Sequence, residues 1–315
     1  MVNAENAFNR PPGSAREAAS LMNPKLSVIL IVHDMRREAP RTLYSLSPGY
    51  QRDVEADDYE VIVVENGSTA PLRRDEVERI APNFSYRWHE TSSTSPVDAV
   101  NLGVELARGD RVAVCVDGAR ILSPGIVHYM LTAFRAFPNP FVYTLGWHVG
   151  DEVQNVSITT GYDQAVEDRL LDSVDWRANG YALFSISTLA LSCRAGWFSK
   201  IAESTCFALS KAEFVRFGGF CAAFQTAGGG LVNLDFFSLA CAAPEVAPVL
   251  LLGEGTFHQF HGGVATNVSM ANHPWDGFHE EYVRIRGKAY AAPAFNPHYL
   301  GRLSPEARRF LGSRP

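Results

Sequence analysis

The chain has 315 residues, of which 46% are hydrophobic and 20% are charged, a composition typical of a globular protein with a substantial core. Its net charge of -6 and its lack of a long basic run argue against a nucleic-acid partner and against a broad attraction to anionic lipid. No apolar run is long enough to span a membrane, and the polar N-terminal stretch lacks the apolar core of a signal peptide. The five cysteines include no C-x-x-C pair, which favours free thiols, so we expect a cytoplasmic protein without a transmembrane segment.

The first half of the chain alternates short apolar runs with amphipathic patterns. Residues 1–24 are polar and contain Pro11, Pro12 and Gly13, which predicts a flexible arm. The pattern then predicts strands at 26–34, 61–64, 84–88 and 112–116, and helices at 73–80, 95–109 and 126–134. Strands joined through helices form a mostly parallel sheet with right-handed crossovers, so residues 25–140 are a nucleotide-fold candidate.

Two of the predicted strands end in a carboxylate that a turn follows. One leads into Glu65 and Asn66, and the other leads into Asp117 and Gly118. At the carboxyl end of a parallel strand, such a side chain faces the crevice where α/β proteins bind ligands. An ordinary strand-to-helix loop with a solvated aspartate explains the second stretch equally well when it is taken alone.

Beyond Phe141 the plain alternation ends, and the pattern predicts a mixed α/β half over residues 141–265. Strands are expected at 141–150, 153–159, 189–193, 205–208 and 249–252, and helices at 163–176, 211–217 and 231–242. The tail, residues 266–315, is basic, aromatic and broken by prolines. It lacks a core-like pattern, so we expect it to pack over the rest of the domain.

Four segments, in this order, resemble the family-2 glycosyltransferases of GT-A fold: LSVILIVHD, YEVIVVENGST, SPVDAVNLGVELARGD with VAVCVDGARILSPG, and FALSKAEFVRFGGF. The resemblance spans Leu26 to His261. It implies a Rossmann-like, mostly parallel central sheet flanked by helices, with a mixed α/β half that binds the acceptor. It further implies transfer of a sugar, with inversion, from a nucleotide-diphosphate sugar to a glycan-type hydroxyl, with UDP-sugars favoured, and a role in polysaccharide biosynthesis.

The same resemblance assigns the donor side. Glu65 takes the place of the acidic residue that accepts a hydrogen bond from the base N3–H, although aspartate is usual there. Asp117 matches the first carboxylate of the Asp-x-Asp element, which contacts the ribose and a divalent cation, whereas Ala119 stands at the second. The other residues that the resemblance assigns to the nucleotide are Val32, His33, Asn66, Asp98, Asn101 and Gly118.

Two features compensate for the missing carboxylate in this interpretation. His258 and His261 resemble the late histidine that supplies a metal ligand in several GT-A enzymes, with His258 preferred, and imidazole suits Mn better than Mg. Arg284 and Arg286 in the tail, with Lys288, are cations that could contact the diphosphate directly. The alternatives are a pair of structural imidazoles and a solvated basic face.

The acceptor side departs further from the family pattern. Cys221 and Ala222 replace an acidic pair, and Asp235 is the one carboxylate near the position of the second pair. An inverting transfer needs a base that takes the proton of the attacking hydroxyl, so Asp235 is the candidate base. The alternative is an aspartate on a helix surface.

Two other functions remain open from the sequence. The lost carboxylates also fit a catalytically weak or inactive protein that binds nucleotide sugars, which donor binding without turnover would identify. A nucleotidyltransferase fits less well, because no glycine-rich phosphate loop follows the first strand. The sequence leaves the sugar, the acceptor and any homo-oligomer undetermined.

Overall fold

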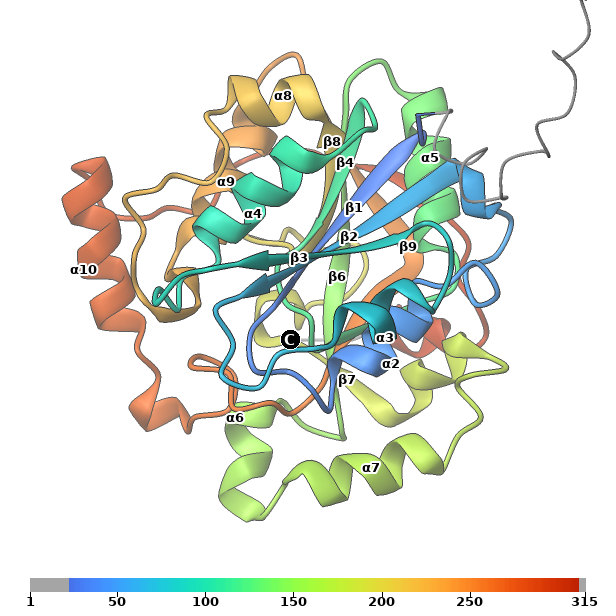
Figure 1. Cartoon of the computed structure of the whole chain (residues 1–315). Helices are drawn as coiled ribbons and strands as arrows, with labels where there is room; N and C mark the ends of the chain where they lie inside the picture. The colour runs from blue at the N-terminus through green and yellow to red at the C-terminus, as the bar shows by residue number, and fades with distance from the viewer. Residues whose placement is uncertain (1–22, 312–315) are drawn as a thin grey trace, which may run out of the picture.

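A computed structural model describes residues 23–311, which form a ten-stranded mixed sheet with helices on both faces (Figure 1). The strand order is β10-β9-β6-β8-β4-β1-β2-β3, with β5 paired to β9 and β7 paired to β6. The strands are β1 (Leu26–Val32), β2 (Tyr59–Asn66), β3 (Phe84–His89), β4 (Arg111–Cys115), β5 (Arg120–Leu122), β6 (Pro140–Val149), β7 (Ser187–Leu189), β8 (Cys206–Ser210), β9 (Ala247–His258) and β10 (His298–Gly301). The predicted α/β fold is confirmed, and all but the last two residues of the predicted arm lie outside the described range.

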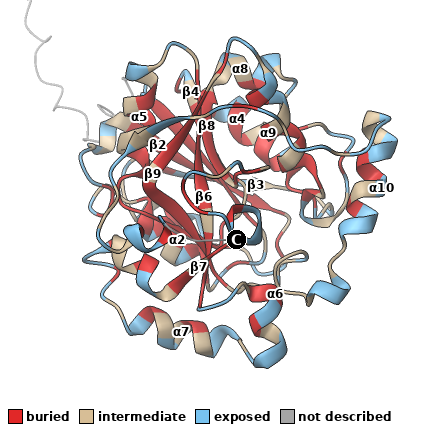
Figure 2. Ribbon diagram, turned by 180° about the vertical axis from the view of Figure 1, so that it is seen from behind, coloured by how far each residue is buried: buried red, intermediate tan, exposed pale blue. Residues whose placement is uncertain are grey.

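The first four strands are parallel, and β8 runs antiparallel between β4 and β6. Figure 2 shows the central strands buried along their length. Alternate residues of β1 pack into two separate cores: Ile29 and Ile31 share one with α4, whereas Val28 and Leu30 share the other with α2 and α5. This burial on both faces explains why these strands are apolar at every position.

Helices cover both faces of the sheet. The α-helices are α2 (Ala39–Ser45), α3 (Arg74–Glu78), α4 (Val97–Leu106), α5 (Ile126–Ala136), α6 (Gln154–Ser157), α7 (Gln164–Asp172), α8 (Lys211–Arg216), α9 (Val232–Ala242) and α10 (Trp275–Arg286). Short 3₁₀ segments lie at Ala56–Asp58, Ile158–Thr160, Gly180–Ile186, Leu191–Cys193, Ala227–Gly229, Met270–Asn272 and Ala307–Phe310. Between residues 23 and 311, no helix combines the length and apolar character needed to cross a membrane.

The segment 153–159, predicted as a strand from its β-branched residues, contains the short helix α6 instead. Both polar side chains at its start are buried. Gln154 contacts His258, and Asn155 donates to two carbonyl oxygens of the 265–268 loop. These tertiary hydrogen bonds outweigh the local preference for extended backbone.

The tail is part of the fold rather than only a cover. β10 pairs in parallel with β9 and so extends the sheet at its edge. Phe278 and Tyr282 of α10 are buried, as are Phe295 and Phe310 further along. These aromatic residues follow no regular spacing in the sequence, but they anchor the tail to the core.

A buried carboxyl group on β9 makes the stability of this fold depend on pH. Glu254 accepts hydrogen bonds from Ser123 Oγ at 2.5 Å, Tyr181 OH at 2.7 Å and the Gly125 N–H at 3.0 Å. Burial nevertheless raises its pKa from 4.5 to about 7. The folded chain then binds more protons than the unfolded chain between these values, so this group's contribution to stability falls as pH rises through that window.

We therefore expect the free energy of unfolding of wild type minus that of Glu254→Gln to fall between pH 4.5 and pH 8. The rise in the pKa of Glu254 limits this fall to about 3 kcal/mol. Denaturant unfolding of both proteins at several pH values measures the difference. A difference that stays constant over this range would show that Glu254 titrates alike in the folded and unfolded chains.

Candidate active site

Asp117, His258 and His261 meet at the carboxyl edge of the sheet. Asp117 follows β4, and His258 is the last residue of β9. His258 Nε2 lies 3.1 Å from Asp117 Oδ2 and 3.1 Å from His261 Nε2, and His261 Nε2 lies 3.8 Å from Asp117 Oδ1. The family resemblance assigns these three residues to one metal site, and in the folded chain they lie next to one another.

The pairing of β9 with its two neighbours surrounds His258 with further polar groups. Arg120 lies opposite His258 in the β5–β9 pair, and His148 lies opposite it in the β6–β9 pair. The Arg120 Nε lies 3.2 Å from Asp117 Oδ2, and the rings of His148 and His258 are 5.2 Å apart. The sequence analysis missed both residues, because only the strand register reveals them.

A buried glutamine fixes the ring of His258. The Nδ1–H of His258 donates to Gln154 Oε1 at 2.8 Å, and the Gln154 amide donates back to the His258 carbonyl oxygen at 3.2 Å. Asn267 Nδ2 donates to the same Gln154 oxygen at 2.8 Å, which sets the orientation of the amide. The Nε2 lone pair of His258 is therefore directed at Asp117 and His261, as second-sphere contacts commonly arrange for a metal ligand.

The charge states of this cluster suit a cation. Burial alone would raise the pKa of Asp117, but His261, His258 and Arg120 hold it well below its usual value. Burial, aided by Arg120, lowers the pKa of His258 to about 4, although Asp117 opposes this shift. At neutral pH the cluster thus offers a carboxylate and a neutral imidazole. Its ligand atoms all lie within 4.8 Å of one another, which fits a divalent ion.

The predicted base-binding residues differ in their freedom to bind. Glu65 is fully buried, and its carboxylate already accepts hydrogen bonds from Ser68 Oγ and from the Leu72 N–H at 2.9 Å. Asn66, which is 2% exposed, donates through Nδ2 to the carbonyl oxygens of Ser93 and Ser95. Its Oδ1 is buried and has no hydrogen-bond partner among the residues that the structure describes. Asn66 therefore has an acceptor without a partner, whereas both carboxylate oxygens of Glu65 already accept hydrogen bonds.

The end of β1 lies beside this turn. The Nδ1–H of His33 donates to the Asn66 carbonyl oxygen at 2.7 Å. A Cβ at Gly118 would lie 2.8 Å from both the Ile31 carbonyl oxygen and Val32 Cγ2, so glycine lets the Asp117 turn approach β1 closely. Val32, His33 and Gly118 therefore shape the edge on which Asp117 lies.

Asp98 and Asn101 of α4 occupy different positions from those expected. Asp98 is exposed in the first turn of the helix. Asn101 donates to the Phe220 carbonyl oxygen at 2.8 Å and accepts from the Phe220 N–H at 2.9 Å. Its amide holds the turn after α8, a structural role that the nucleotide assignment did not foresee.

The expected base and the expected phosphate ligand bind each other. Arg286 of α10 contacts Asp235 of α9 through two hydrogen bonds, at 2.8 and 2.5 Å, and Asp235 is 4% exposed. A carboxylate bound at both oxygens by a guanidinium is not a free base, so the assignment of Asp235 is corrected to a link between two helices. Arg284 and Lys288 are exposed on or just beyond α10, which Figures 1 and 2 show at the margin of the molecule.

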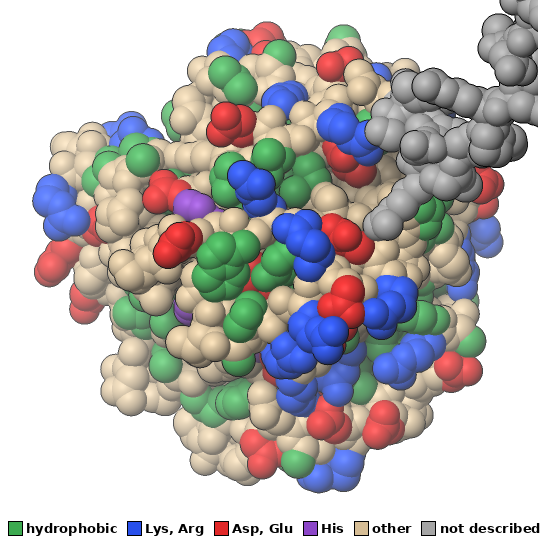
Figure 3. Space-filling view, viewed as in Figure 1, with side chains coloured by type: hydrophobic (Ala, Val, Ile, Leu, Met, Phe, Trp, Pro, Cys, Tyr) green, Lys and Arg blue, Asp and Glu red, His purple; other side chains and the backbone are tan. Residues whose placement is uncertain are grey.

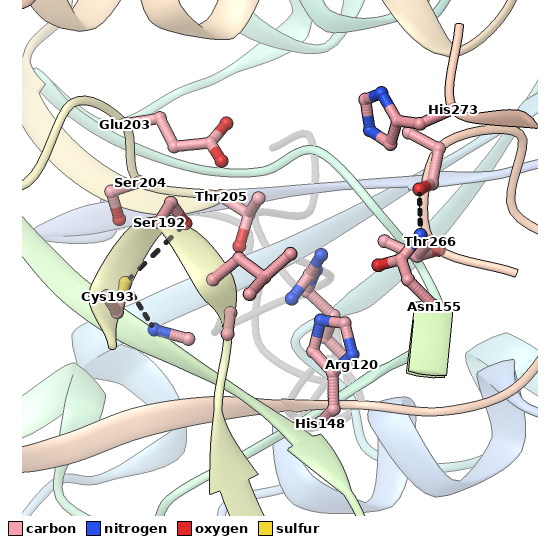
Figure 4. Close-up of a pocket in the computed structure, with 14 residues that line it drawn as sticks. Arg120, His148, Asn155, Ser192, Cys193, Glu203, Ser204, Thr205, Thr266 and His273 are labelled. Atoms are coloured by element: carbon pink, nitrogen blue, oxygen red, sulfur yellow. Dashed lines mark hydrogen bonds between the residues drawn. The ribbon is translucent and has the colours of Figure 1, made fainter. Parts of the chain in front are cut away.

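A pocket holds another carboxylate next to Asp117, His258 and His261, which we call the ligand cluster. Its volume is about 160 Å³, and its lining includes Arg120, His148, Glu203 and His273. Figure 4 shows Glu203 on one wall and Arg120 with His148 on the other. Asn233 Nδ2 donates to Glu203 Oε2 at 3.2 Å. Glu203 precedes β8, and because β8 is antiparallel to β4 its start lies at the edge where β4 ends.

Comparison with known proteins agrees with this architecture. The model of the family "Glycosyl transferase family 2" matches residues 27–183. The structure of S. aureus TarS 1-349 in complex with UDP-GlcNAc is 16% identical, with a TM-score of 0.54 over 83% of this chain and 65% of that one. Another structure of TarS 1-349 is 16% identical, with a TM-score of 0.49 over 75% of this chain and 60% of that one.

The mannosyltransferase PcManGT from Pyrobaculum calidifontis, in complex with GDP-Man and Mn²⁺, is 17% identical, with a TM-score of 0.47 over 93% of this chain and 69% of that one. This chain spans less than two thirds of the TarS 1-349 structures. No curated protein matches it. The chain belongs to glycosyltransferase family 2 and has the GT-A fold, as its strand and turn motifs predicted.

Proposed function

We propose that this chain transfers a sugar from a nucleotide-diphosphate sugar to a hydroxyl acceptor, with inversion at the anomeric carbon. The observation that carries the proposal is the convergence of Asp117, His258 and His261 at the carboxyl edge of a GT-A sheet. This edge is where α/β proteins bind nucleotides. TarS holds UDP-GlcNAc on a similar fold, and we extend that donor class, a UDP-sugar, to this chain.

In this proposal Asp117, His258 and His261 hold a divalent cation. When bound, the ion neutralises charge that builds up on the leaving diphosphate. The mixed carboxylate and imidazole set favours Mn²⁺ over Mg²⁺. Ala119 cannot supply the usual second carboxylate, and His261 provides the third ligand in its place.

We assign recognition of the base to Asn66. Its buried Oδ1 lacks a partner, whereas its Nδ2 is engaged by two main-chain oxygens. A lone acceptor suits a base edge that carries an N–H donor, as uracil does at N3 and guanine does at N1, and it disfavours cytosine, whose N3 is an acceptor. Glu65 then holds the turn through Ser68 and Leu72.

We assign the base that accepts the acceptor proton to Glu203. It lines the pocket beside the ligand cluster, and Asn233 orients it through one oxygen. Its other oxygen stays available for the hydroxyl that attacks the anomeric carbon. Asp235 lacks this freedom because both its oxygens contact Arg286.

Calorimetric titration of the protein with UDP, GDP and CDP, each with Mn²⁺ or with EDTA, tests the proposal. We expect UDP to bind in the presence of Mn²⁺, with affinity reduced about tenfold or more by EDTA or by replacing UDP with CDP. Loss of binding to all three nucleotides would reject the donor assignment. Donor binding without release of UDP from any sugar nucleotide would favour the inactive binding protein.

Two wider expectations belong to the proposal. All five cysteines are free, and their chemistry suits the reducing cytoplasm. A role in polysaccharide biosynthesis follows from the family resemblance, and the glycan acceptor is defined only by the need for a hydroxyl group.

A further inference from the structure

The pocket beside the ligand cluster contains an arginine that forms no hydrogen bond with any residue between 23 and 311. Arg120 is 8% exposed, and its one charged contact within that part of the chain is the 3.2 Å approach of Nε to Asp117 Oδ2, which does not have hydrogen-bond geometry. Its guanidinium points into the pocket in Figure 4. A buried guanidinium is favourable only when its N–H donors are satisfied, and the ion pair with Asp117 leaves the donors of Arg120 without hydrogen bonds, so this arrangement calls for a ligand.

Several other arginines of this chain form ion pairs with acidic residues. Figure 3 shows Lys and Arg side chains gathered over α2 and α3. There, Arg36 contacts Glu76, and Arg74 contacts Glu78. Those cations are neutralised by neighbouring acids on the surface, whereas the acid beside Arg120 also faces two histidines.

The rest of the pocket suits a sugar. Hydroxyl groups of Ser192, Thr205 and Thr266 line it together with two imidazoles, His148 and His273. A volume of about 160 Å³ is below that of sites for larger organic ligands and suits a single ring. Such a lining binds sugar hydroxyls, and the guanidinium fork adds a site whose shape matches a carboxylate or a phosphate.

We propose that this pocket selects a sugar with an anionic substituent, held by Arg120. The inference rests on the proposed function and narrows its substrate class to acidic sugars, either uronates or sugar phosphates. Glu203 on the opposite wall makes no ion pair with Arg120 within the described residues, so the fork remains open for the substrate.

The test compares wild type with Arg120→Gln, which removes the charge, and with Arg194→Gln, a matched control at the exposed residue that follows the pocket-lining Cys193. Calorimetry with Mn²⁺ measures binding of UDP, UDP-glucose and UDP-glucuronate in a donor arm. With UDP present, it measures glucose, glucuronate and glucose 6-phosphate in an acceptor arm. The two arms distinguish donor from acceptor, and the last two ligands distinguish carboxylate from phosphate.

We expect wild type and Arg194→Gln to bind one anionic sugar about tenfold or more tightly than its neutral counterpart, and Arg120→Gln to lose that preference. Equal weakening of UDP and both UDP-sugars in Arg120→Gln would overturn the inference, since Arg120 would then serve the diphosphate. UDP binding by wild type with no anionic preference in either arm would also overturn it and leave the proposed function standing. Failure of wild type to bind UDP would instead reject the proposed function.

Discussion

Replacing Asp117 with asparagine is expected to lower the affinity for Mn²⁺ by about 100-fold or more and to abolish Mn²⁺-dependent binding of UDP. The substitution removes the one carboxylate of the ligand cluster, since Ala119 supplies none, and leaves only two imidazoles. Loss of a residue that only hydrogen-bonds to a metal ligand already lowers metal affinity about 10- to 100-fold. Mn²⁺ binding is measured by electron paramagnetic resonance, independently of turnover, and UDP binding by calorimetry.

Asp110→Asn is the matched control, because Asp110 is exposed at the opposite end of β4 and undergoes the same chemical change. It should bind Mn²⁺ and UDP like wild type. Unchanged Mn²⁺ affinity in Asp117→Asn would refute the metal assignment. UDP binding that persists with EDTA in that variant would assign the diphosphate to protein cations instead.

The sequence predicted those site residues that lie at the ends of parallel strands. Asp117 and Asn66 each follow or end a parallel strand, and such residues meet at one edge whatever the details of packing. The late histidines could be predicted only through the family resemblance. Their convergence on Asp117 depends on the strand order, which brings β9 alongside β5 and β6.

Pairings between distant segments were not predictable in this way. Asp235 and Arg286 lie on separate helices, and nothing local to either residue indicates that they bind each other. The sequence therefore predicts a catalytic base at Asp235 and a diphosphate contact at Arg286, whereas in the folded chain the two side chains bind each other. Gln154 was missed for a related reason, since a β-branched stretch predicted a strand and concealed the helix that presents it.

Glu203 is the site residue that the sequence pattern was least able to predict. It lies in no motif, and as a lone acid before a short strand it resembles any loop residue. Its importance comes from the direction of β8, which is antiparallel to β4 and so begins where β4 ends. A periodic pattern predicts a strand but gives no direction relative to its neighbours.

Replacing Glu203 with glutamine is expected to lower kcat by a factor of about 100 to 10,000, the range that a general base contributes. Affinity for UDP should change less than about twofold, because Glu203 lies across the pocket from Arg120 and is not among the ligand cluster. The assay is release of UDP from the sugar nucleotide that binds, with water or an acceptor as nucleophile. Asp235→Asn is the informative comparison, since it breaks the contact with Arg286 and should lower stability while retaining kcat. A large loss of kcat in a folded Asp235→Asn, with wild-type turnover in Glu203→Gln, would reverse the assignment of the base.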